Sequence, residues 1–261
     1  MSTLSVPLAL RSYEYWLFQY KRTWRGSVVS TVLFPVLFLA SMGLGLGTLV
    51  DSSASRGVDG LPYLVFLAPG LLAATAMQTG VGESTYPVMG AIKWIKTYHA
   101  MLATPIGVLD VLVGHLLFIA SRILLGSTIF LAVMAVFGAL RSPLALLALP
   151  AAVLTGMAFS APVAAFSATT ENDAGFAALF RFVVTPLFLF GGVFFPVQQL
   201  PPVLEQVAYA TPLWHGVALS RGLALGTSTA GGVLLHVAYL SAWIAVGGWL
   251  AARAFQRRLA V

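Results

Sequence analysis

Four ionisable side chains interrupt the apolar segments of this chain, and they are the first candidates for chemistry. Glu83 and Asp110 stand near the ends of their segments, whereas Arg122 and Arg181 stand further in. A proton relay in a membrane carrier needs carboxylates near the bilayer midplane, but the deepest charge here is the arginine at 122. The pattern therefore argues against a relay. It predicts that both arginines pair or snorkel to the interface, with contact to an anionic head group as the alternative.

The motifs of the common enzyme classes are absent from the sequence. The lysines, Lys21, Lys93 and Lys96, each follow an aromatic or aliphatic residue, so none completes a Gly-Lys-Ser/Thr phosphate loop. There is no H-E-x-x-H, no G-x-S-x-G and no cysteine. The histidines lack the spacing of metal ligands and are expected to be structural; they are His99, His115, His215 and His236. We expect no catalytic residue, no metal site and no cofactor bound by this chain.

Composition identifies the solvent that surrounds these residues. Hydrophobic residues make up 59% of the chain and charged residues 8%, against about 25% charged residues in soluble domains. So few charges cannot cover a water-exposed surface. In lipid the backbone must satisfy its own hydrogen bonds, and the long uninterrupted apolar runs favour helices over a barrel. The basic residues flank these runs, which indicates membrane topology rather than nucleic-acid binding.

The sequence predicts an all-α integral membrane protein with six transmembrane helices in a single domain, 1–261. Residues 1–25 are expected to form an interfacial helix with Tyr13, Trp16, Tyr20 and Trp24 on its apolar face; a helix packed on a partner protein is the alternative. No cleavable signal peptide is recognised, so the first span is expected to act as an anchor. The predicted spans are 26–50, 61–86, 107–137, 144–169, 174–195 and 228–252.

Lysine and arginine placement predicts the orientation. If the N-terminus is cytoplasmic, the outside segments carry only Arg56, Arg141 and Arg221. The positive-inside rule then predicts that both termini are cytoplasmic (N-in, C-in). The inside segments would carry Arg11, Lys21, Arg22, Arg25, Lys93, Lys96, Arg253, Arg257 and Arg258.

One predicted cytoplasmic element lies between the second and third spans, at 88–105. Ile92, Ile95, His99 and Leu102 recur at helical spacing, with the lysines on other faces. The pattern predicts one short amphipathic helix that ends before Pro105.

The stretch 182–226 does not cross back as a simple span. An apolar run breaks at Gly191-Gly192 and ends at Pro196, and prolines at Leu200-Pro201 and Thr211-Pro212 each favour a helix start. We expect a pair of extracytoplasmic re-entrant helices at 197–226, a helical hairpin before the last span. Gln206 and His215 are expected to face water. A lid over an exit path and a structural plug are both consistent with the pattern.

Three stretches together resemble the membrane permease subunit of type-2 ABC exporters, particularly the nodulation-factor and daunorubicin-resistance permeases. The first is Glu83-x-x-Tyr86 followed by 97–104 (TYHAMLAT), and the second is 154–159 (LTGMAF). The third is 185–197 (TPLFLFGGVFFPV), followed by Leu200-Pro201 and 211–213 (TPL). The similarity extends over nearly the whole chain in the same order, and the Gly-Gly, Phe-Pro and Leu-Pro spacing is its most specific part.

The resemblance implies a permease that dimerises with an identical or homologous permease and binds two separate ABC ATPase subunits, which hold ATP and Mg. It implies export, location in a bacterial plasma (inner) membrane, and contact with membrane lipids. Residues 1–25 match the family's connecting helix and 88–105 its coupling helix. The implied ATPase-coupling residues are Glu83, Lys93, Lys96, Tyr98, His99 and Met101, and the implied translocation path or gate contains Phe188, Phe194 and Phe195. The nodulation-factor permeases tend to carry an acidic residue at the position of His99, so no pairwise contact is transferred there.

The leading functional hypothesis is therefore ATP-driven export of an amphipathic, lipid-linked or drug-like molecule. An ion-coupled secondary carrier would be expected to show internal repeats, and no convincing repeat is present. An intramembrane enzyme would need a nucleophile or metal set. A structural partner for another membrane protein remains an alternative.

Overall fold

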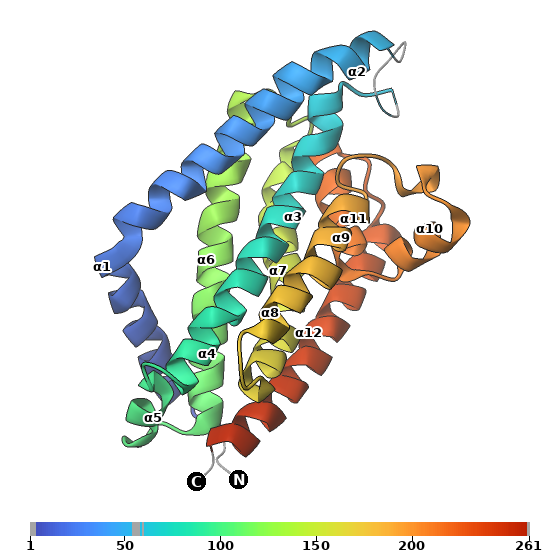
Figure 1. Ribbon diagram of the computed structural model, residues 1–261. Helices are drawn as coiled ribbons and strands as arrows, with labels where there is room; N and C mark the ends of the chain where they lie inside the picture. The colour runs from blue at the N-terminus through green and yellow to red at the C-terminus, as the bar shows by residue number, and fades with distance from the viewer. Residues whose placement is uncertain (1–3, 54–57, 59, 260–261) are drawn as a thin grey trace.

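The computed structural model describes residues 4–53, 58 and 60–259, so residues 1–3 of the predicted interfacial helix and Arg56 lie outside the described residues. The described chain is a bundle of helices joined by short connections (Figure 1). The first half contains α1 Val6–Phe38, π-helical η1 Leu39–Leu46, α2 Gly47–Ser53, α3 Tyr63–Ser84, α4 Tyr86–Ile92, α5 Thr97–Leu102 and α6 Val108–Val136. The second half contains η2 Pro143–Leu147, α7 Ala148–Thr169, α8 Ala174–Leu179, η3 Phe180–Val184, α9 Thr185–Phe190, η4 Val197–Gln199, α10 Pro202–Tyr209, α11 Pro212–Leu225 and α12 Ala230–Leu259.

Five helical stretches are long and apolar enough to cross a membrane: Thr31–Ser52, Tyr63–Ile92, Val108–Val136, Pro143–Thr169 and Ala230–Leu259. The predicted fifth span is shorter than expected, because its helix ends at Phe190. Gly191 and Gly192 follow, and Gly192 has a φ of 79°, a left-handed conformation that ends a helix and suits glycine. Six crossings therefore stay a prediction.

The N-terminal region and the first span form one continuous helical path rather than two separate elements. Helical residues run from Val6 to Ser53, with Pro35 inside α1 and a π-helical stretch at Leu39–Leu46. Figure 1 shows α1 bending away from the bundle and returning across it. The interfacial position predicted for residues 1–25 stays a prediction.

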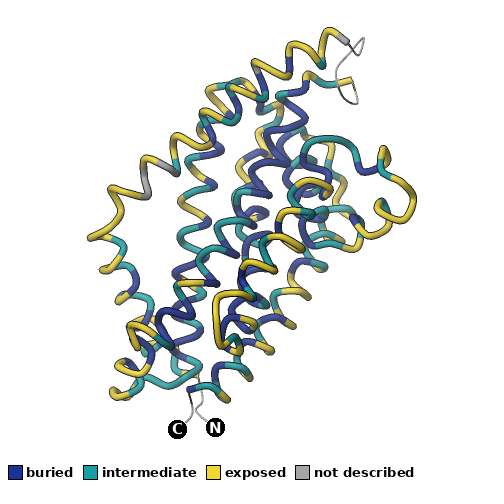
Figure 2. The backbone as a smooth tube through the Cα atoms, viewed as in Figure 1, coloured by how far each residue is buried: buried dark blue, intermediate teal, exposed yellow. Residues whose placement is uncertain are grey.

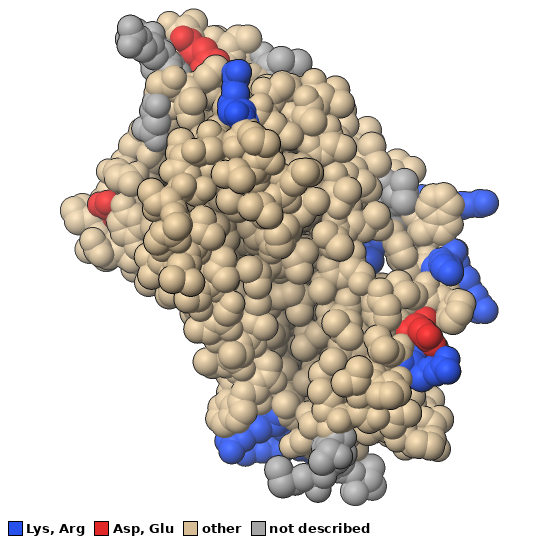
Figure 3. Space-filling model, turned by 180° about the vertical axis from the view of Figure 1, so that it is seen from behind, with Lys and Arg blue, Asp and Glu red and all other residues tan. Residues whose placement is uncertain are grey.

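The core lies along α3 and α7. In the most apolar window of α3 78% of the residues are buried, against 11% for α12, so α3 is central and α12 is peripheral. Figure 2 shows the same gradient, with the buried colour concentrated on the inner helices. Figure 3 shows that the charges on the opposite side of the molecule lie mostly along its rim, which leaves an uncharged surface that suits contact with lipid.

Glycines allow the central helices to pack backbone against backbone. A Cβ added at Gly80 of α3 would lie 2.4 Å from the carbonyl oxygen of Gly156 in α7, and one added at Gly156 would lie 2.7 Å from that of Ala76. Gly156 belongs to the 154–159 stretch singled out above, and small residues at such crossings are typical of membrane helices. The motif is therefore explained by helix contact.

The two ends of the bundle differ. Both termini, α5 and the 170–173 turn lie at one end, which we call the terminal end (Figure 1). At the opposite end α11 approaches the start of α7, where the Arg141 amide donates to the Ala224 carbonyl. Two helices, α10 and α11, occupy the stretch of the predicted pair and begin at Pro202 and Pro212, whereas the re-entrant extracytoplasmic position stays a prediction.

Candidate functional site

The stretch 88–105 forms two short helices, so the prediction of one amphipathic helix is wrong. α4 and α5 are separated by a turn in which Lys96 adopts a left-handed φ of 57°. The reversal destroys the expected common face: Ile92 is buried, whereas Ile95 is 71% exposed. Residues at helical spacing share one face of a helix only if the helix is continuous between them.

Tyr98 anchors α5 in the protein interior. Its side chain is fully buried, and its hydroxyl shares a hydrogen bond with Nδ1 of His115 in α6. Burial raises the pKa of the Tyr98 hydroxyl well above its usual value, so the group remains protonated. Trp16 stacks on the His115 ring with centroids 4.2 Å apart, and the Phe255 ring lies 5.6 Å from that of Tyr98. The cluster joins α1, α5, α6 and α12.

Met101 is also internal. It is 8% exposed, and the Ser12 hydroxyl of α1 lies 3.7 Å from its sulfur. Tyr98 and Met101 therefore face the core rather than a docking partner. The exposed side of this region includes Trp94, Ile95, Lys96 and His99.

Lys93 is engaged within the chain. Its ammonium lies 2.9 Å from Oε2 of Glu171, and Arg258 lies 2.6 Å from the other oxygen of that carboxylate. The hydrogen bond from Arg258 and that from Lys93 lower the pKa of Glu171 to about 2. The ion bridge ties the end of α4 to the 170–173 turn and to the last turn of α12.

Glu83 and Arg122 form a partly buried ion pair between α3 and α6. The Arg122 Nε lies 3.1 Å from Glu83 Oε1, and the guanidinium lies 4.2 Å from the centroid of the Tyr20 ring in α1. Pairing, one of the predicted outcomes, is thus confirmed for Arg122. Arg181 lies exposed on η3. Asp110 is a structural cap, since it accepts from the amides of Gly107 and Ser5 at 2.9 and 2.7 Å.

Two of the three candidate gate residues come together. The rings of Phe188 and Phe194 are 5.1 Å apart in an edge-to-face arrangement, and Phe38 of α1 lies 6.2 Å from Phe194. Phe195 is half-buried in the same connection. Phe38 gave no distinguishing signal in the sequence, because it is one aromatic residue in an apolar helix.

Arg221 is a functional candidate that sequence reasoning missed. From α11 it donates to the Phe66 carbonyl of α3 at 3.1 Å and to the Gly192 carbonyl at 2.8 Å, and its guanidinium lies 3.9 Å from the Phe66 ring centroid. It therefore fastens the connection that carries Phe194 to two helices. Its position inside an otherwise apolar helix was the available signal.

Two histidines meet near the start of α11. Nδ1 of His215 lies 2.8 Å from Nδ1 of His236, and Tyr239 stacks on His215 at 3.8 Å. His215 is 7% exposed, so the expectation that it faces water is wrong. It packs inward because α11 lies between α3, α7 and α12 rather than on the surface. Among the described residues no group of three potential metal ligands is present.

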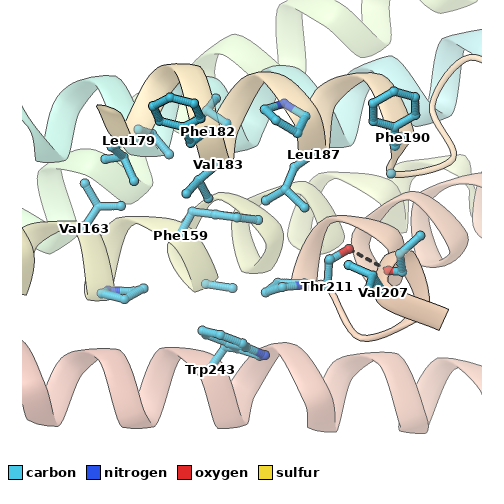
Figure 4. A pocket seen from close by; sticks show the side chains of 18 of the residues that line it. Phe159, Val163, Leu179, Phe182, Val183, Leu187, Phe190, Val207, Thr211 and Trp243 are labelled. Atoms are coloured by element: carbon cyan, nitrogen blue, oxygen red, sulfur yellow. Dashed lines mark hydrogen bonds between the residues drawn. The ribbon is translucent and has the colours of Figure 1, made fainter. Parts of the chain in front are cut away.

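A large apolar pocket opens between α7, α9 and α12 (Figure 4). Its volume is about 640 Å³, with Phe159 and Val163 on one wall, Val183 and Leu187 on the second, and Trp243 on the third. Figure 4 shows Trp243 projecting from α12 toward the other two helices. The pocket suits an apolar chain rather than a polar solute.

Comparison with known proteins identifies the family. The family model "ABC-2 type transporter" matches residues 13–225. The chain is similar to nodulation protein J of Sinorhizobium fredii, with 31% identity over 95% of this chain and 91% of that protein. It is 32% identical to nodulation protein J of Rhizobium leguminosarum bv. viciae, over 95% of this chain and 92% of that protein. It is also 23% identical to the inner membrane transport permease YadH of Escherichia coli, over 77% of this chain and 76% of that protein. With its apolar helices and its match over most of its length, the chain belongs to the ABC-2 type transporter family of membrane permeases.

Proposed function

We propose that this chain is the permease subunit of an ATP-driven exporter in a bacterial plasma membrane. It works with a second permease, identical or homologous, and with two separate ATPase subunits that bind ATP and Mg. It moves an amphipathic, lipid-linked or drug-like molecule outward, with both termini in the cytoplasm. Family membership, the names of the relatives and the lysine and arginine bias support the proposal.

The observation that carries the proposal is the surface of the α4–α5 turn. Trp94 is 61% and Ile95 71% exposed at the terminal end, although α5 itself is held firmly by Tyr98. Exposed apolar side chains on a fixed, water-facing element indicate a protein-binding surface. The ATPase docks here, on Trp94, Ile95, Lys96 and His99.

Coupling follows from how α5 is attached. When ATP draws the two ATPases together, each pulls on its α4–α5 turn, and the Tyr98–His115–Trp16–Phe255 cluster transmits the motion to α1, α6 and α12. The Lys93–Glu171–Arg258 bridge extends it to the α7–α8 turn. Tyr98, Met101 and Lys93 thus position the docking surface, and Glu83 belongs to the supporting Arg122 pair.

The outer gate is the aromatic contact of Phe194 with Phe38 and Phe188, with Phe195 beside it. Separation of α1 from α9 opens it, and the Arg221 hydrogen bonds to the 191–193 connection hold it closed. The α10–α11 pair then forms an extracytoplasmic re-entrant lid. A lid predicts movement during transport, whereas a structural plug predicts none.

The test replaces Ile95 by Asp in the assembled transporter and measures co-purification of the ATPase together with ATP-dependent export from inverted vesicles. We expect ATPase recovery and export to fall at least tenfold, since loss of one buried anchor costs about 1.4 kcal/mol or more. Val203→Asp is the matched control for ATPase recovery, because Val203 is 75% exposed on α10, away from the α4–α5 turn. Unchanged recovery and export in Ile95→Asp would show that the ATPase does not dock on this turn.

A further inference from the structure

An arginine-lined groove runs along the outer face of α12 at the terminal end. Trp249, Arg253 and Arg257 repeat every four residues and so share one face of that helix. They line a cavity of about 650 Å³ whose opposite wall is α7, at Phe166 and Thr169. Its walls are apolar below the arginines and cationic above them.

Arg258 already forms an ion pair within the chain, whereas Arg253 and Arg257 are available to bind an anion. Arg258 is committed to the Glu171 carboxylate at 2.6 Å. Arg253 lies 4.2 Å from the centroid of the Trp249 ring, which fixes its guanidinium at the groove. Within residues 4–53, 58 and 60–259, no Asp or Glu forms an ion pair with Arg253 or Arg257. Two exposed guanidinium groups four residues apart match the oxygens of one phosphodiester.

The groove continues into the apolar pocket of Figure 4. Both cavities are lined by Pro162 and Phe166 of α7, so they lie next to each other, and the two together are called the α7–α12 channel. On α12 the channel extends from Arg253 to Trp243, which is about 15 Å at the rise of an α-helix. That distance is about half of a bilayer's hydrocarbon core of roughly 30 Å, the depth of one leaflet.

We propose that this channel binds one anionic phospholipid of the leaflet on the side of the two termini. Arg253 and Arg257 hold the phosphate, Trp249 lies at the interface, and one acyl chain follows α7 down to Trp243. The lipid fills the space between α9 and α12 and braces the shorter helix Ala174–Phe190 against its neighbour. The inference concerns a resident lipid and stands independently of export and its direction.

The first test measures lipid retained by the purified full-length chain. Native mass spectrometry is recorded in detergent with added phosphatidylglycerol, phosphatidylcholine or glycerol 3-phosphate. We expect phosphatidylglycerol to bind, glycerol 3-phosphate not to bind, and Arg253→Gln/Arg257→Gln to bind phosphatidylglycerol roughly 25-fold more weakly, from about 1 kcal/mol for each cation. Arg22→Gln/Arg25→Gln is the matched control, which removes two exposed arginines of α1 and should leave binding unchanged.

The second test locates the acyl chain. Phosphatidylglycerol brominated at mid-chain should quench the fluorescence of Trp243, so Trp243→Phe should show less quenching than the unaltered chain, whereas Trp24→Phe should not. Size-exclusion profiles and helical content verify that each variant is folded. Equal binding of phosphatidylcholine, an unchanged affinity in the double arginine variant, or quenching that is independent of Trp243 would each overturn the proposal. Displacement of the lipid by a second copy of the chain would assign the groove to a protein interface instead, and would overturn it as well.

Discussion

Single side chains at the terminal end decide how the α4–α5 turn is held. Tyr98, Lys93 and Met101 all belong to the stretch that resembles a coupling helix, yet the fold gives them internal partners. Their neighbours Trp94 and Ile95 face outward. Anchoring residues and exposed residues, the latter proposed above to bind the ATPase, therefore lie within a few positions of one another in the chain.

Removal of the Tyr98 hydroxyl should destabilise the protein. In Tyr98→Phe the buried Nδ1 of His115 loses its partner, which costs about 1–3 kcal/mol. Thermal unfolding in detergent measures this as a lower Tm. Tyr15→Phe is the matched control on α1, because Tyr15 is 42% exposed. Equal Tm values for the two variants would show that the hydrogen bond does not contribute.

The Glu171 bridge should make a pH-dependent contribution. Its carboxylate has a pKa of about 2 in the folded chain, below the ordinary value of 4.5 for a glutamate. The stabilisation is therefore present above pH 4.5 and is lost as pH falls from 4.5 through about 2. The effect should be small, since Glu171 is 66% exposed.

Hydrogen exchange followed by mass spectrometry measures this bridge. At pH 7 we expect faster exchange in 86–96 and 170–173 in Glu171→Gln than in the unaltered chain. Asp173→Gln, a substitution in the same turn, is the control. Protection that is unchanged in Glu171→Gln would mean that the bridge does not order the turn.

Among the elements, the α3–α7 crossing is the closest backbone contact described above, and it carries a paired prediction. Gly80→Ala would place a methyl group 2.4 Å from the Gly156 carbonyl oxygen, so the helices must separate at a cost of about 1–3 kcal/mol. Gly82→Ala on the same helix meets nothing within 4 Å and should stabilise α3 by up to about 1 kcal/mol. Unfolding of the two variants in detergent should shift in opposite directions. A shift of the same sign would contradict the close packing.

Element boundaries followed from local chemistry to different degrees. Prolines predicted the starts of α10 and α11. The predicted fifth span ran to residue 195, whereas its helix ends at Phe190, directly before Gly191-Gly192. The α4–α5 break was missed, because Lys96 in a left-handed conformation leaves no glycine or proline signal. The helical spacing of hydrophobic residues in 88–105 continues through the α4–α5 turn, so the sequence pattern gave no sign of the break.

For the whole molecule, the main prediction is its orientation in the membrane. The chain has no cysteine, so single cysteines can be added without background. Gln198→Cys and Thr227→Cys, both exposed, should react with a membrane-impermeant maleimide in intact cells. His99→Cys should react only after permeabilisation. The reverse pattern would invert the proposed topology and place the α4–α5 turn away from any cytoplasmic ATPase.

Composition, charge placement and the proline and glycine positions were enough to establish a helical membrane protein and several helix ends, and three sequence stretches were enough to establish its family resemblance. These properties depend on local sequence and on the solvent, so they are readable without the fold. The partners of individual side chains were decided only by tertiary structure. Glu171 meets Lys93 and Arg258, Glu83 meets Arg122, and His215 meets His236 across long stretches of chain. Such pairs depend on how helices are placed beside one another, which no periodicity within a single helix specifies.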